Sequence, residues 1–152
     1  MERKFIAKEL FVTTNKMRRY LDQKHQKNGL YLSQARLLTY LYYNDKNNEN
    51  VYQVNIEKHF QIRKASVSGL LNSLSKLNLI ERVDSKTDKR KKKIILTNEG
   101  IEKALIAIDT IKEFETNLSN IVSHEEFLSL NNSLDKINNW LMEKENEDEK
   151  TI

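Results

Sequence analysis

The chain has no proline and only three glycines among its 152 residues. Both residue types interrupt helices, because proline lacks a backbone N–H and glycine costs about 1 kcal/mol relative to alanine in a helix interior. A chain with so few of them can form long helices and has few sites for tight turns. The sequence therefore predicts a mainly α-helical fold.

Apolar residues recur at helical spacing, which predicts helices over residues 5–25, 33–44, 54–60 and 64–79, and two more within 98–145. Gly29 can end the first helix in the left-handed conformation. Ser33 and Thr97 are expected to cap the helices that follow them. Ser123 and Glu126 have the spacing of a capping box, which predicts the start of the last helix.

Residues 80–84 have a short strand-like pattern, and residues 92–96 have that of a returning strand. The polar stretch between them predicts a β-hairpin with an exposed tip. Ten basic residues lie between Arg63 and Lys93 against three acidic ones, although the net charge of the whole chain is only +4. The positive field is therefore local. Such a field is typical of a surface that binds a polyanion, and a solvated lysine-rich surface is the alternative.

The helical patterns on either side of residues 61–63 are close enough for a helix-turn-helix. The second helix has an aliphatic face and a face of small or polar residues, namely Ala65, Ser66, Ser68, Gly69, Asn72 and Ser73. Small side chains allow close approach to the major groove, where Asn can read adenine with two hydrogen bonds. Arg63 and Lys64 lie at the helix start, where backbone N–H groups attract phosphate. Taken alone, this helix is equally consistent with a helix that reads DNA and with an ordinary amphipathic helix that has a small polar outer face.

The basic hairpin favours the first interpretation, because it directly follows the candidate reading helix. A narrow cationic loop beside a helix in the major groove can reach the adjacent minor groove, where Arg inserts favourably. Asp88 and Arg90 are two residues apart and are expected to pair across the turn. An exposed pair contributes only about 0–1 kcal/mol, so its expected role is to position Arg90.

The sequence also argues against several other classes of protein. His25, His59 and His124 are far apart, there is no cysteine, and no phosphate-binding or nucleophile motif is present. We therefore expect no enzyme, no metal site and no cofactor. No apolar run approaches the roughly 20 residues of a membrane span, and the N-terminus is unlike a signal peptide. A cytoplasmic protein without a membrane partner is expected.

The order of certain residues resembles the MarR family of winged helix-turn-helix transcriptional regulators. The matching residues are Ile62, Ser66, Val67 and Ser68, then Leu74, Leu77, Leu79, Ile80 and Arg82, then Asp88, Arg90, Leu96, Thr97 and Gly100. The core of the match covers residues 33–100, and the D-x-R pattern followed by L-T-x-x-G is its most specific part. The resemblance implies a mainly α-helical fold with a small β-hairpin wing and long N- and C-terminal dimerisation helices.

The resemblance further implies a homodimer on a pseudo-palindromic site in double-stranded DNA. Residues 1–30 and 98–145 would form the dimerisation helices, 31–97 the winged helix-turn-helix, and 146–152 a charged tail. The implied DNA contacts are Arg63, Lys64, Ala65, Ser66, Ser68 and Asn72 on the recognition helix and Lys86, Asp88, Lys89, Arg90 and Lys91 on the wing. The expected dimer contacts are Ile6, Leu10, Leu118, Leu130, Leu134, Ile137 and Leu141.

Three positions depart from the family pattern. Arg63 stands where a capping residue is usual, Gly69 where a longer polar side chain is common, and Asn78 in place of glycine. Many members bind a small aromatic effector, for which the tyrosines are candidates, although each is better explained by packing: Tyr20, Tyr31, Tyr40, Tyr42, Tyr43 and Tyr52. The hypothesis is a dimeric repressor released by such an effector. The alternatives are a protein-interaction module and a nonspecific nucleic-acid binder.

Overall fold

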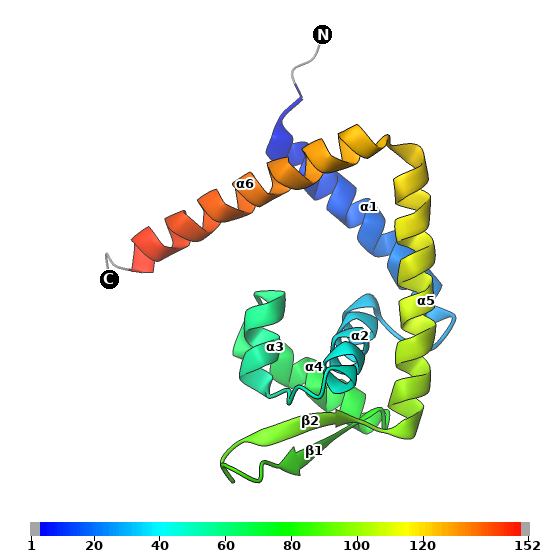
Figure 1. Cartoon of the computed structure of the whole chain (residues 1–152), viewed down its shortest axis with the longest axis vertical. Coiled ribbons are helices and arrows are strands. Elements are labelled where there is room, and N and C mark those ends of the chain that lie inside the picture. Colours follow the sequence, from blue (N-terminus) through cyan, green and yellow to red (C-terminus); the bar gives the residue numbers. More distant parts are fainter. Residues whose placement is uncertain (1–3, 150–152) are drawn as a thin grey trace. The chain divides into compact units, whose positions relative to one another are not determined.

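The computed structural model describes residues 4–149, and residues 1–3 and 150–152 lie outside that range. The elements run in the order α1 (Ile6–Gln26), α2 (Leu32–Lys46), α3 (Gln53–Phe60), α4 (Lys64–Lys76), β1 (Ile80–Asp84), β2 (Lys92–Leu96), α5 (Asn98–Ile121) and α6 (His124–Glu149) (Figure 1). The chain divides into two compact units, residues 1–111 and 112–152, with the boundary inside α5.

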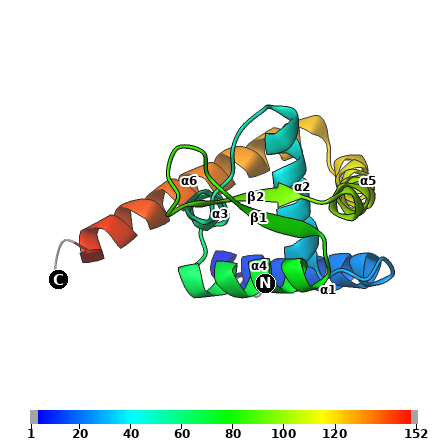
Figure 2. The same cartoon turned by 90° about the horizontal axis from the view of Figure 1, so that it is seen from below.

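The predicted mainly helical fold with a β-hairpin is confirmed. The two strands have the predicted bounds and pair antiparallel, from Ile80 opposite Leu96 to Asp84 opposite Lys92. In Figures 1 and 2 the hairpin extends away from the group formed by α2, α3 and α4. The helix α6 includes residues 146–149 of the predicted charged tail, whereas residues 150–152 of that tail lie outside the described range.

The core of the first unit is made by apolar side chains that point inward from three helices. The largest fully buried ones are Leu37 and Leu38 of α2, Ile56 of α3, and Val67, Leu71 and Leu74 of α4. Ile94 of β2 and Ala104 of α5 complete this cluster. The two helices of the helix-turn-helix are therefore held against α2 by their apolar faces, which leaves their other faces available.

Two of the three N-terminal helix caps predicted from the sequence are present in the structure. Thr97 Oγ1 accepts a hydrogen bond from the Gly100 N–H at 2.9 Å, as expected for a cap. The capping box is also confirmed, since the Ser123 N–H donates to Glu126 Oε2 at 2.8 Å and the Glu126 N–H donates to Ser123 Oγ at 3.2 Å.

The predicted Ser33 cap is wrong, because α2 begins at Leu32 with Tyr31 as its N-cap residue. The Tyr31 N–H donates to Gln34 Oε1 at 2.9 Å. The Leu32 N–H donates to Asp22 Oδ1 of α1 at 2.8 Å. A carboxylate from another helix therefore satisfies one of the free N–H groups at the start of α2, and local sequence cannot reveal such a partner.

The start of α5 lies very close to the turn that precedes the hairpin. Asn78 takes up the left-handed conformation in this turn, with φ of 57°. The Thr97 N–H donates to Leu79 O at 3.1 Å, and Thr97 Oγ1 donates to Asn78 O at 2.7 Å. A Cβ atom at Gly100 would lie 1.9 Å from Leu79 O, so only glycine fits there. The close approach explains both the Thr and the Gly of the L-T-x-x-G pattern.

Gly100→Ala should lower the free energy of unfolding by about 1–3 kcal/mol, the usual cost of overpacking a close contact. The matched control is Gly69→Ala on α4, where an added Cβ would meet nothing within 4 Å. That change should raise the free energy of unfolding by about 1 kcal/mol through helix propensity. Urea unfolding of both variants at one protein concentration measures the two effects, and equal effects of the same sign would contradict this account.

His25, at the end of α1, is fully buried at 0% exposure. Within residues 4–149 neither of its ring nitrogens has a hydrogen-bond partner. Burial lowers the pKa of the imidazole below its ordinary value of 6.5, and the nearby Asp22 carboxylate opposes this shift. The folded protein therefore holds a neutral histidine that the unfolded chain protonates more readily.

Acidification from pH 7.5 to 5 should therefore reduce stability at this site. Below pH 6.5 the unfolded chain binds a proton that the folded protein resists, so the free energy of unfolding falls as the pH drops. His25→Leu should flatten this part of the profile, whereas His59→Gln, at an exposed position, should leave it in place. Urea unfolding at several pH values measures it, and an unchanged slope in His25→Leu would refute the explanation.

Candidate nucleic-acid interface

A tight turn joins α3 and α4 through residues 61–63. Gln61 takes up the left-handed conformation with φ of 52°, and its Nε2 donates to Lys58 O at 2.7 Å. The Ile62 N–H donates to Glu57 O at 3.3 Å. These bonds take up the polar groups at the end of α3 and turn the chain into α4, which gives the predicted helix-turn-helix.

The outer face of α4 carries most of the small residues predicted to lie there. Ala65, Ser66, Gly69 and Asn72 are exposed. Ser68 is half-buried, and its Oγ accepts a hydrogen bond from Gln53 Nε2 of α3 at 2.9 Å. The side chains on this face are therefore short enough for another molecule to come close to the helix backbone.

Ser73 does not belong to this face, so its predicted placement is wrong. It is half-buried, its Oγ donates to Leu70 O at 2.7 Å, and the same oxygen accepts from Gln34 Nε2 of α2 at 3.2 Å. The residue lies on the side of α4 that packs against the body of the first unit. A serine has no apolar signature, so periodicity alone places it on either side.

Two cations mark the N-terminus of α4. Arg63 is the N-cap residue, is exposed, and makes no side-chain cap hydrogen bond. Lys64, the first residue of the helix, is also exposed. A basic residue therefore stands at the N-cap position. This leaves the first N–H groups of the helix without a side-chain cap, in a positive field that attracts an anion.

The wing is attached to the segment that leads into α3. The Ile94 N–H of β2 donates to Val51 O at 2.8 Å, and Tyr52 forms a bridge with Lys93. The Tyr52 hydroxyl lies 3.3 Å from Ser85 Oγ at the base of the tip. This pairing fixes the wing relative to the helix-turn-helix.

Ser85 organises the turn at the wing tip. It is only 6% exposed, and its Oγ accepts hydrogen bonds from the Thr87 N–H at 3.3 Å and the Asp88 N–H at 3.4 Å. The Ser85 N–H donates to Lys91 O at 3.1 Å, and the Lys91 N–H donates to Asp88 O at 3.0 Å. Sequence reasoning assigned neither Ser85 nor Tyr52 a role in the wing, because neither belongs to a charge cluster or a helical stripe.

Asp88 and Arg90 form the expected pair. Arg90 Nε donates to Asp88 Oδ1 at 3.3 Å, and the Arg90 N–H donates to the same oxygen at 3.0 Å. The Arg90 side chain is 92% exposed, so the pair adds little stability and mainly orients the guanidinium.

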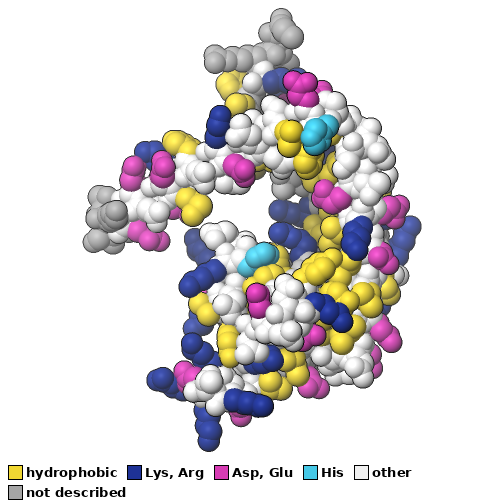
Figure 3. Space-filling view, in the orientation of Figure 1, with side chains coloured by type: hydrophobic (Ala, Val, Ile, Leu, Met, Phe, Trp, Pro, Cys, Tyr) yellow, Lys and Arg dark blue, Asp and Glu magenta, His cyan; other side chains and the backbone are white. Residues whose placement is uncertain are grey.

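The other cations of the tip differ in their surroundings. Lys86, Lys89 and Lys91 are exposed, and Lys91 Nζ lies 5.9 Å from the centre of the Tyr52 ring. Lys92 forms an ion pair with Asp84 at the base of the tip, so part of its charge is neutralised. Figure 3 shows Lys and Arg side chains gathered around the hairpin, at the lower left of the view.

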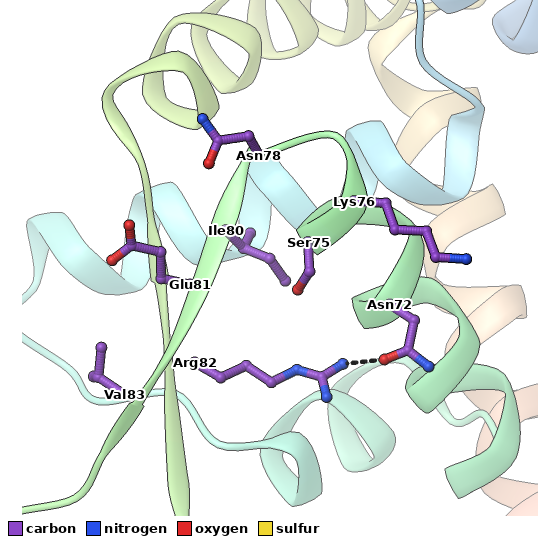
Figure 4. Close-up of a pocket in the computed structure, with 8 residues that line it drawn as sticks. All are labelled: Asn72, Ser75, Lys76, Asn78, Ile80, Glu81, Arg82 and Val83. Carbon is purple, nitrogen blue, oxygen red and sulfur yellow. Dashed lines mark hydrogen bonds between the residues drawn. The ribbon is translucent and has the colours of Figure 1, made fainter.

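A further polar contact joins the wing to α4. Arg82 extends from β1, and its Nη2 donates to Asn72 Oδ1 at 2.7 Å (Figure 4). Both residues line an open groove of about 640 Å³ between α4 and β1, together with Ser75 and Lys76. Arg82 was not among the predicted site residues. Its sequence signals were its place in the family pattern and in the basic region, and neither reveals its partner.

Within the described range of 4–149, no group of three or more His, Asp or Glu side chains is arranged to hold a metal ion. No helix in that range is both long and apolar enough to cross a membrane.

Comparison with known proteins places this winged helix in a family. The model of the MarR family matches residues 28–91. The crystal structure of Staphylococcus aureus MepR in its DNA-binding conformation is 30% identical, over 90% of this chain and 99% of that one, with a TM-score of 0.78. The chain belongs to the MarR family.

Two further structures agree with this membership. The complex of S. aureus MepR with DNA is 27% identical over 91% of this chain and 99% of that one, with a TM-score of 0.85. The transcription regulator MarR from Oenococcus oeni, at 22% identity over 88% of this chain and 98% of that one and a TM-score of 0.74, shares the fold. No curated protein matches the sequence.

Family membership confirms the general function expected from the sequence. The protein is a DNA-binding transcriptional regulator of MarR type and not an enzyme. Its winged helix-turn-helix, with long helices at both ends of the chain, is the fold of this family.

Proposed function

We propose that the protein is a homodimeric repressor that binds a pseudo-palindromic operator with α4 in the major groove and the wing in the minor groove. The observation that carries the proposal is the side-by-side arrangement, within one unit, of the low polar face of α4 and a wing with exposed Arg90. A groove about 12 Å wide accepts one helix, and a helix with small outer residues comes closest to its floor.

The expected contacts divide into two kinds. Ser66, Ser68 and Asn72 face outward as candidate base contacts, with Ala65 available for an apolar contact. The basic residues supply phosphate contacts and minor-groove insertion, and they are Arg63, Lys64, Lys86, Lys89, Arg90 and Lys91. Asp88 serves to orient Arg90. Neutralised phosphates release counterions, so affinity should fall steeply as salt rises.

The proposed dimer is supported by apolar side chains that have no cover in a single chain. None of the residues His124–Glu149 of α6 is buried. Its leucines Leu130 and Leu141 are 52% and 46% exposed, and Leu134 and Ile137 are half-buried. In α1, Ile6 is 71% exposed and Leu10 is half-buried. Leu118 of α5 is also half-buried. Extended apolar surface of this kind marks an interface with another protein.

Repression by occupancy suits this architecture. A dimer seated on an operator can block polymerase by occupying the same DNA, and this needs no element besides the winged helix and the candidate dimerisation helices. Release by a small aromatic effector belongs to the same proposal. It is tested by repeating the binding experiment below with a panel of phenolic compounds.

The deciding experiment is selection of bound sites from a random pool of DNA duplexes. The proposal expects one enriched inverted repeat, with half-sites about one DNA turn, or roughly 34–36 Å, apart. Binding without any enriched motif would favour the nonspecific binder. No shift of duplex DNA at low salt would favour the protein-interaction module.

Arg90→Ala should weaken binding to the selected operator about tenfold, because it removes the only arginine at the wing tip. The slope of log affinity against log salt should become shallower by about one unit, since one phosphate or groove contact is lost. Lys112→Ala, a loss of one charge on α5 outside the winged helix, is the matched control. Fluorescence anisotropy over a salt series measures both, and unchanged affinity for Arg90→Ala would remove the wing from the interface.

Leu134→Asp should convert the dimer into a monomer by placing a charge on the apolar stripe of α6. Asn132→Asp adds the same charge to the opposite side of that helix and should leave the dimer intact. Sedimentation equilibrium measures the mass of each variant. A dimeric Leu134→Asp protein would exclude this stripe as the dimer interface.

A further inference from the structure

The hydrogen bond between Arg82 and Asn72 restricts what Asn72 can do. Arg82 Nη2 donates to Asn72 Oδ1 at 2.7 Å. Figure 4 shows the guanidinium reaching from β1 across the groove to the amide on α4, while Glu81 and Val83 lie on the other side of the strand. Asn72 is exposed on the face of α4 that is proposed to read bases. One of the two lone pairs of its only acceptor atom is therefore engaged within the protein, and Arg82 holds that atom turned toward β1.

Recognition of adenine by asparagine needs both ends of the amide. The oxygen accepts from adenine N6 while the nitrogen donates to N7. Guanine differs, because its N7 and O6 in the major groove are both acceptors. With Oδ1 turned toward Arg82, the pair keeps one free lone pair on that oxygen, whereas the amide Nδ2 and the remaining guanidinium N–H groups are all donors, so donors outnumber acceptors on the side offered to DNA.

We propose that Arg82 is a specificity-determining residue that fixes the Asn72 amide with its donors outward, so that the pair reads guanine rather than adenine. The inference rests on the proposed function and deepens it. It also replaces the sequence-based expectation that Asn72 reads adenine with two hydrogen bonds.

The surroundings of the pair support a fixed orientation. If the amide rotated by half a turn, its NH₂ group would face the donors of Arg82, which carries no acceptor. Glu81 of β1 also lines the groove, but in Figure 4 its side chain points away from the guanidinium, which is bonded to Asn72. Lys76 adds a third donor group, so the part of the groove between α4 and Arg82 favours a base edge or phosphate rich in acceptors.

The test compares sites selected from the random duplex pool by the full-length protein and its variants. Asn72→Ala identifies the base position that depends on this residue, because preference should be lost there alone. The unaltered protein should select guanine at that position. Arg82→Met, which keeps the length of the side chain but removes every donor, should release Asn72 Oδ1 and shift the guanine-to-adenine ratio at least tenfold toward adenine.

A second variant guards against a simple loss of structure. Arg82→Gln offers an amide that can pair with Asn72 in either orientation, so it should abolish the discrimination between guanine and adenine without reversing it. Retained unfolding midpoints and salt slopes show that each variant keeps its fold and its phosphate contacts. The selection is interpreted from the variant or variants that pass this check.

The outcomes separate this inference from the function on which it rests. If the unaltered protein selects adenine at the base position that depends on Asn72, the inference is overturned, while the proposed function as an operator-binding repressor still stands. The same holds if Asn72→Ala changes no position, or if both Arg82 variants keep the guanine preference. A pool without any motif overturns the proposed function and this inference with it.

Discussion

The hydrogen bond from the Ile94 N–H to Val51 O holds the wing and the helix-turn-helix in one frame. It adds the backbone before α3 to the edge of the hairpin, so that the hairpin cannot move independently of α3. The Tyr52 hydroxyl beside Ser85 extends this attachment to the tip. A two-stranded hairpin alone is only marginally stable in water, so a side-by-side arrangement of wing and helix depends on this pairing.

The opposite end of the hairpin is fixed by a close contact of a different kind. Gly100 brings the start of α5 against Leu79 O, and Thr97 bonds to the same turn. The hairpin is thus held where it joins α5 as well as where it meets α3. The tip lies beyond both of these attachments, and Asp88 and Ser85 supply the local hydrogen bonds that keep its turn in one shape.

The difference between what the sequence predicted and what it missed follows from the distance between interacting residues. The two strands are consecutive in the chain, and the Thr97 cap and the Ser123–Glu126 box join residues three apart; all of these were predicted correctly. The Ser33 cap was wrong because Asp22 of α1 supplies an acceptor for the start of α2. The side of α4 on which Ser73 lies was wrong because a hydroxyl suits either face.

The contacts that shape the interface are of the second, nonlocal type. The bond between Arg82 and Asn72 joins residues whose proximity depends on the packing of the hairpin against α4. Composition and charge show that Arg82 belongs to a basic region, but they do not show which acceptor atom its guanidinium binds. The chemistry of Asn72 as a donor or an acceptor is therefore decided by a residue on another element.

Gly69 makes this contact more important for reading DNA. Gly69 adds no side chain to the outer face of α4, and an added Cβ there would meet nothing within 4 Å. Ser66 and Ser68 are short, and Ser68 already receives a hydrogen bond from Gln53. Arg82 of β1 therefore brings a long side chain with several donors to Asn72 on the outer face of α4. Base preference would then depend on the position of the strand as well as on the sequence of the helix.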